Sequence, residues 1–261
     1  MPWDLALILL VLAVVVPWRG AARIKQPLAR PQLGTADRLA LYASTIAFQW
    51  PAAAVAAWRS LAHGFTPARL GIAFGQPELT TAITLALAVL LGANQFFSLR
   101  RLARLPAQRQ GFLHQLARKL MPQTLVEALA FVALVVTVAL CEEFLYRGFA
   151  FAALQQATDS ELLAALASSA MFALAHLYQG RRGLATTFIV GLVFAVARIL
   201  TASLAPSIVA HLLADLLAGL AAPRLLAATR NQGTEPTRSH DAADAAHESS
   251  TNRNDYMNDK I

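Results

Sequence analysis

The sequence predicts an all-α membrane protein, a polytopic bundle of about seven transmembrane helices. Its 261 residues are 57% hydrophobic and only 14% charged, whereas a soluble domain carries about 25% charged residues. The mean hydropathy is +0.50. The apolar residues also gather in blocks close to the roughly 20 residues that an α-helix needs to cross a bilayer.

The apolar blocks follow one another along most of the chain. The first, 5–16, lies between Trp3 and Trp18, an aromatic pattern typical of the two membrane surfaces. Because Asp4 but no Lys or Arg precedes it, we interpret this block as a short uncleaved span rather than a secretory signal. Pro51 is expected to kink the second block. The other expected spans lie at 39–58, 79–98, 125–150, 162–178, 184–203 and 206–222.

The net charge of +7 comes from basic residues in short loops between the apolar blocks. These residues favour alternate loops, as topology signals do, and form no aromatic-interleaved patch, so we exclude nucleic acid as a partner. Their distribution predicts an outside N-terminus and a cytoplasmic C-terminus. The sequence thus predicts an integral protein of the plasma (inner) membrane, with the lipid bilayer as its partner.

Three regions are expected along the chain. Residues 1–119 hold the N-terminal spans and a basic cytoplasmic loop. Residues 120–226 form a core that carries most of the ionisable residues found inside apolar blocks. Residues 227–261 contain few large apolar residues and should be a disordered tail.

Ionisable residues inside apolar blocks are costly in lipid, so they should face one another or a wet cavity. They are Glu142, Glu143, Arg147, His176, Arg198, His211 and Asp215. Arg198 could neutralise a site, bind a substrate carboxylate or snorkel to the membrane surface, and we favour snorkelling. For the others, the mixture of acids and histidines on three of the blocks predicts a polar chamber in the membrane.

Helical spacing predicts which of these side chains meet. Glu143 and Arg147 are four residues apart and can pair, whereas Glu142 is rotated by about 100° and points elsewhere. His211 and Asp215 are also four apart, so the carboxylate can meet one ring nitrogen and leave the other for a reacting atom or a metal. A glutamate without a partner beside histidines can activate water as a general base.

Three motifs fall in order along the apolar blocks: "EEFLYR" at 142–147, "FALAH" at 172–176 and "HLLAD" at 211–215. They match E-E-x-x-x-R, F-x-x-x-H and H-x-x-x-(N or D). The chain therefore resembles the CPBP family of intramembrane proteases, which includes CAAX prenyl proteases, bacteriocin-processing proteins and Abi proteins. The resemblance implies a membrane-embedded endopeptidase that hydrolyses membrane-associated peptides, for example CAAX-type or bacteriocin-like ones.

The resemblance also implies roles for the residues of the motifs. Glu142 corresponds to the catalytic glutamate and Glu143 with Arg147 to its supporting pair, and three residues take the remaining positions of the site: His176, His211 and Asp215. The family has been described both as metalloproteases and as metal-free glutamate proteases. With Zn²⁺, the ligands would be Glu142, His176 and His211, with an open position for water.

Without metal, Glu142 and His176 would activate water while His211 and the last motif residue stabilise the oxyanion. That last residue is asparagine in many members but Asp215 here. Because an ionised aspartate only accepts hydrogen bonds, we expect Asp215 to orient His211 instead. Phe172, one turn before His176, is expected to pack beside it.

Two other kinds of function stay open from the residues alone. A membrane-buried acid such as Glu142 also serves proton-coupled transporters. A non-catalytic immunity or scaffold membrane protein could carry the same motifs as a relic. Uptake driven by a pH gradient would identify a transporter. A phenotype that does not change when the motif residues are substituted would identify a non-catalytic protein.

Overall fold

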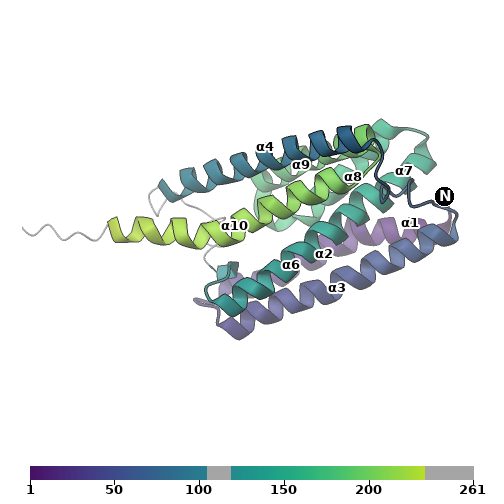
Figure 1. Ribbon diagram of the computed structural model, residues 1–261. Helices are drawn as coiled ribbons and strands as arrows, with labels where there is room; N and C mark the ends of the chain where they lie inside the picture. The colour runs from purple at the N-terminus through teal and green to yellow at the C-terminus, as the bar shows by residue number, and fades with distance from the viewer. Residues whose placement is uncertain (105–118, 233–261) are drawn as a thin grey trace, which may run out of the picture. The chain divides into compact units, whose positions relative to one another are not determined.

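The computed structural model describes residues 1–104 and 119–232, which are mostly helical with no strand among them (Figure 1). This confirms the all-α prediction. The chain divides into two units, 1–225 and 226–261. The expected basic loop falls largely on 105–118, outside the described residues. The expected tail lies outside them too, except that 227–232 continue the last helix.

The helices follow one another along the chain. In chain order they are α1 (Trp3–Leu10), η1 (Val11–Val15), α2 (Val16–Ala29), α3 (Thr35–Ala62), α4 (Pro77–Arg104), α6 (Leu125–Glu143), η3 (Phe144–Ala150), α7 (Phe151–Thr158), α8 (Glu161–Ala175), η4 (Leu177–Gln179), α9 (Gly180–Thr201) and α10 (Ala205–Gln232). Residues 63–76 form a longer loop between α3 and α4. The segments η1 and η3 are π-helical turns within longer helices. Such turns occur often at functional sites.

Five helices among the described residues are long and apolar enough to cross a membrane. They are Trp3–Lys25, Thr35–Ala62, Pro77–Arg104, Leu125–Thr158 and Leu177–Thr201. Two shorter apolar helices, Glu161–Ala175 and Ala205–Ala221, match the fifth and seventh expected spans. The 15 residues of α8 extend about 22 Å, less than the roughly 30 Å of a bilayer core. This part of the chain therefore forms a helical membrane bundle with spans of unequal length.

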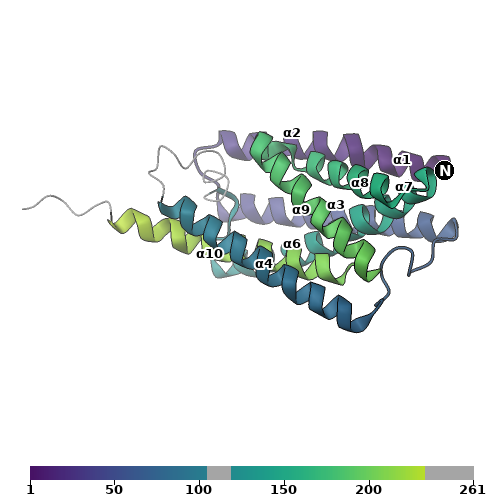
Figure 2. The same cartoon turned by 90° about the horizontal axis from the view of Figure 1, so that it is seen from above.

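Helix α8 buries one face against its neighbours and leaves Leu162 and Leu163 exposed on the other; its course beside α7 and α9 can be followed in Figure 2. It packs against α7, α9, η1 and η3, while α3 packs along α6. Small buried residues line α8 and allow this close approach; they are Ala164, Ala165, Ser168 and Ser169. The Ser160 hydroxyl accepts from the Leu163 N–H and caps the start of α8.

Two polar clusters fasten α3 to its neighbours. Arg38 donates from Nε and Nη2 to the two carboxylate oxygens of Glu127 on α6, both at 2.9 Å. Near the other end of α3, Arg59 donates to Asp4 of α1 at 2.6 Å, and His63 Nε2 lies 2.9 Å from the same carboxylate. The Arg38–Glu127 pair is buried, so each partner compensates a charge that would otherwise be costly inside the bundle, whereas Arg59 and His63 are partly exposed.

Arg198 anchors the loop between α3 and α4. It is only 7% exposed, and its Nη2 donates to the Arg69 carbonyl at 2.8 Å. The Leu204 N–H also donates to the Gly71 carbonyl of this loop at 2.8 Å. The expectation that Arg198 snorkels to the membrane surface is therefore wrong, because backbone carbonyls of the loop receive its charge inside the protein.

Candidate active site

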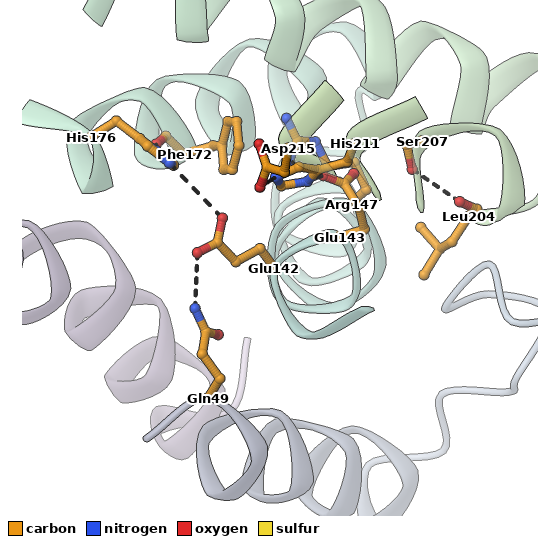
Figure 3. Close-up of polar contacts among 10 residues, drawn as sticks. All are labelled: Gln49, Glu142, Glu143, Arg147, Phe172, His176, Leu204, Ser207, His211 and Asp215. Atoms are coloured by element: carbon orange, nitrogen blue, oxygen red, sulfur yellow. Dashed lines mark hydrogen bonds and ion pairs between the residues drawn. The ribbon is translucent and has the colours of Figure 1, made fainter. Parts of the chain in front are cut away.

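Glu142 and Glu143 close the last turn of α6, where the π-helical turn η3 begins. Their adjacent positions send the two carboxylates to different sides of the helix (Figure 3). Glu143 is fully buried, whereas Glu142 keeps about 15% of its side chain exposed and turns toward α3. The two acids thus occupy different environments, as the spacing predicted.

Glu143 joins two helices through a single oxygen. Its Oε1 accepts a hydrogen bond from Arg147 Nη1 at 3.0 Å and lies 2.9 Å from His211 Nδ1 on α10. The Arg147 guanidinium is fully buried and sits 3.9 Å from the centre of the Phe172 ring. Such a cation–π contact compensates part of the desolvation of the guanidinium.

Several buried polar atoms around these residues lack a hydrogen-bond partner among the described residues. They are Glu142 Oε2, Glu143 Oε2, Tyr146 Oη, and Nε and Nη2 of Arg147. Buried polar atoms are nearly always paired, with protein groups or with ordered water. Their concentration here is typical of a site that receives water or a substrate.

His176 follows α8 directly and faces Glu142. Its Nδ1 lies 2.9 Å from the Phe172 carbonyl, which can only accept, so Nδ1 carries the hydrogen and Nε2 is a free acceptor in the neutral ring. Nε2 lies 4.0 Å from Glu142 Oε2. The Phe172 and His176 ring centres are 4.7 Å apart, which confirms the expected packing. A water molecule that lies to one side of the line joining Nε2 and Oε2 can form a hydrogen bond with both atoms.

Gln49 is a site residue that the sequence motifs do not contain. Its Nε2 donates to Glu142 Oε1 at 2.8 Å from the middle of α3 (Figure 3). The available signal was an amide side chain within an apolar block, immediately before Trp50 and Pro51. No helical spacing links it to Glu142, because 93 positions separate the two residues.

His211 is bounded by carboxylates on both ring nitrogens. Glu143 Oε1 lies 2.9 Å from Nδ1, and Asp215 Oδ2 lies 3.5 Å from Nε2. The closer and more buried partner is therefore Glu143, although spacing along the helix favoured Asp215 for orienting the ring. Carboxylates only accept hydrogen bonds, so both contacts are made together when the ring carries two hydrogens.

An apolar cavity of about 390 Å³ reaches Glu142. Its walls come from α1, η1, α2, α3 and η3, and Gln49, Glu142 and Tyr146 are its polar members. Apolar wall residues include Leu7, Ile8, Val11, Phe48, Val55 and Leu145. A cavity with mostly apolar walls and a few polar groups is the common form of a small-molecule or peptide side-chain site.

The predicted zinc ligands do not gather as a metal site in this arrangement. Within 1–104 and 119–232, no group of three or more His, Cys, Asp or Glu residues is placed to hold a metal ion. Both ring nitrogens of His211 face carboxylate oxygens of the protein. The residues present therefore do not fit a zinc ion held by Glu142, His176 and His211. Zinc stays an untested implication of the family resemblance, and the catalytic roles proposed for Glu142, His176 and His211 do not require it.

Comparison with protein families gives a match for this part of the chain. Residues 124–217 match the family model described as type II CAAX prenyl endopeptidase, Rce1-like. The match contains all seven specified residues of the three motifs and confirms the resemblance. Gln49 and the cavity walls contributed by α1 to α3 lie outside it. Neither the curated proteins nor the solved structures contain a match to the chain.

Proposed function

Because residues 124–217 match the type II CAAX prenyl endopeptidase family, we propose that this membrane-embedded protease cleaves with a water molecule activated by Glu142. The observation that carries the proposal is the gap of 4.0 Å between Glu142 Oε2 and His176 Nε2. Both atoms can accept a hydrogen bond, and Oε2 has no protein donor among the described residues. A water that donates to both would present its oxygen to a peptide carbonyl.

The proposed reaction uses Glu142 twice. As the water oxygen attacks the carbonyl carbon, Glu142 takes one proton, and His176 holds the second hydrogen and orients the attack. The carbonyl oxygen becomes an oxyanion in the tetrahedral intermediate. When the C–N bond breaks, Glu142 returns the proton to the departing nitrogen. The products are a carboxylic acid and an amine, and the enzyme regains its starting state.

His211 is the proposed donor to the oxyanion. Glu143 holds Nδ1 at 2.9 Å, whereas Asp215 lies 3.5 Å from Nε2. Because a contact of that length binds the hydrogen only weakly, the Nε2–H stays available to a developing oxyanion placed in its direction. Donors fixed in place before the reaction stabilise such charge strongly in a site that excludes water. Arg147 supports this geometry by holding Glu143.

The proposed substrate is a membrane-associated peptide whose apolar part enters the cavity beside Glu142. The 390 Å³ cavity and its aliphatic walls support this assignment, as does the family match for a CAAX-type substrate. Bacteriocin-like peptides are the other substrate class that the resemblance implies. The lipid bilayer would deliver either kind of substrate to the site.

The test is cleavage of C-terminal peptides, prenylated and unprenylated, by purified protein in detergent or liposomes. Glu142→Gln should abolish product formation, a loss of at least about 10²-fold, while the variant still inserts and folds. Glu161→Gln at the start of α8 is the matched control and should cleave normally. Full activity of Glu142→Gln would defeat the proposal. Uptake driven by a proton gradient, without any cleaved product, would favour the transporter instead.

A further inference from the structure

Gln49 reaches the proposed base from a helix that the family match does not include. Its Nε2 donates to Glu142 Oε1 at 2.8 Å, and the residue is only 9% exposed. We infer that Gln49 is a positioning residue, which holds Oε1 so that Oε2 faces His176. This inference rests on the proposed role of Glu142 and adds a residue from α3 to the site.

The hydrogen bond from Gln49 sets the orientation of the Glu142 carboxylate. The terminal torsion of a glutamate is broad and roughly two-fold, so an unheld carboxylate samples many orientations. An amide that donates to Oε1 fixes the plane of the group and therefore the direction of Oε2. Hydrogen bonds to an ionised carboxylate are shorter and stronger than neutral ones, so this one can hold the group during the attack.

Helix α3 is fixed well enough to give the amide a defined position. One residue after Gln49, Trp50 Nε1 donates to the Thr137 hydroxyl of α6 at 3.2 Å. Toward one end, Arg38 forms two hydrogen bonds with Glu127, also on α6. A group held by a rigid and independently fastened element keeps the productive geometry that catalysis requires.

The contacts between α3 and α6 make it possible to distinguish a positioning role of Gln49 from a packing role. Because Arg38 and Trp50 already join α3 to α6, loss of the Gln49 hydrogen bond should leave the helix pair in place. The free carboxylate would then lose its orientation toward His176. The expected effect is therefore a lower kcat with KM and thermal stability close to those of the unaltered protein.

The experiment compares Gln49→Met and Gln49→His in the full-length chain. Methionine nearly preserves the shape and removes the donor, so kcat should fall by about 10- to 100-fold while KM changes by less than about two-fold. Histidine offers a ring N–H at a similar reach, so kcat should recover above the methionine value. Gln155→Met is the matched control, because Gln155 donates to Glu161 at 3.1 Å on an exposed surface.

Each result separates this inference from the proposed function. If Gln49→Met cleaves at the original kcat while Glu142→Gln is inactive, the positioning role is overturned and the glutamate mechanism stands. If Glu142→Gln keeps full activity, the mechanism itself fails. A drop in Tm of Gln49→Met that parallels its loss of activity would assign Gln49 to packing. Equal kcat values for the methionine and histidine variants would also count against a donor role.

Discussion

Glu143 and His211 lie 2.9 Å apart although 68 positions separate them in the chain. This contact links the motif on α6 to the motif on α10, and Arg147 donates to the same carboxylate oxygen. It explains why two neighbouring acids occur at the end of α6. Glu143 holds the arginine and the histidine inside the protein, which leaves Glu142 free to face His176 and the cavity.

Arg147→Met should destabilise the protein strongly. The guanidinium and the Glu143 carboxylate are both fully buried, and removal of one partner from a buried pair typically costs about 3–5 kcal/mol because the other charge stays uncompensated. We expect a large decrease in Tm in detergent, measured by differential scanning fluorimetry. Cleavage should be lost as well, since Glu143 would no longer be held against His211.

The control for this variant is Arg182→Met on α9, where the side chain is exposed. That substitution should leave Tm nearly unchanged, because exposed charges contribute little to stability. A Tm for Arg147→Met equal to that of the control would contradict the claim that the Glu143–Arg147 pair stabilises the protein.

Asp215→Asn should keep most of the cleavage activity, whereas His211→Gln should not. Asp215 is 3.5 Å from His211 Nε2 and its side chain is 40% exposed, while Glu143 fixes Nδ1 at 2.9 Å. We expect kcat within about tenfold of the original for Asp215→Asn. Loss of a preorganised oxyanion donor should lower kcat by about 10²- to 10³-fold in His211→Gln.

Steady-state kinetics on one peptide substrate measures both variants, with Asp159→Asn, at the end of α7, as the control. Comparable losses for Asp215→Asn and His211→Gln would show that the closer contact with Glu143 does not orient the ring sufficiently. The orienting role would then return to Asp215, as the helical spacing favoured.

Local geometry explains what the sequence could predict. Apolar blocks specified the helices, and the spacing of four residues specified the Glu143–Arg147 pair, because both depend only on neighbours within one helix. The pairs Gln49–Glu142 and Glu143–His211 join different helices, and their residues are 93 and 68 positions apart. Their partners depend on how the helices pack, which neither hydropathy nor periodicity determines. The prediction for Arg198 was wrong for the same reason, because the carbonyls that it contacts belong to a loop far away in the sequence.

Removal of metal should leave cleavage unchanged. As the side chains are arranged, Glu142, His176 and His211 do not form a group that could hold an ion, and His211 Nδ1 already faces Glu143. We expect equal rates before and after dialysis against a strong chelator, and less than one zinc ion per chain by elemental analysis.

A zinc-dependent peptidase treated in parallel is the control for chelation. Loss of activity that returns on addition of Zn²⁺, together with one bound ion per chain, would contradict this expectation. The three residues would then have to move together on binding the ion, and His211 would have to leave a carboxylate.

Ala52→Phe should weaken substrate binding while the chemical step continues. Ala52 lines the cavity beside Glu142, so a phenyl ring there would fill space that the apolar part of a substrate needs. Loss of apolar contacts in such a site should raise KM by about tenfold, and kcat should change little because Gln49 and His176 stay in place. Ala54→Phe is the matched control, since Ala54 is exposed on the same helix and does not line the cavity. An unchanged KM for Ala52→Phe, or an equal rise for both variants, would mean that substrates reach Glu142 by a different route.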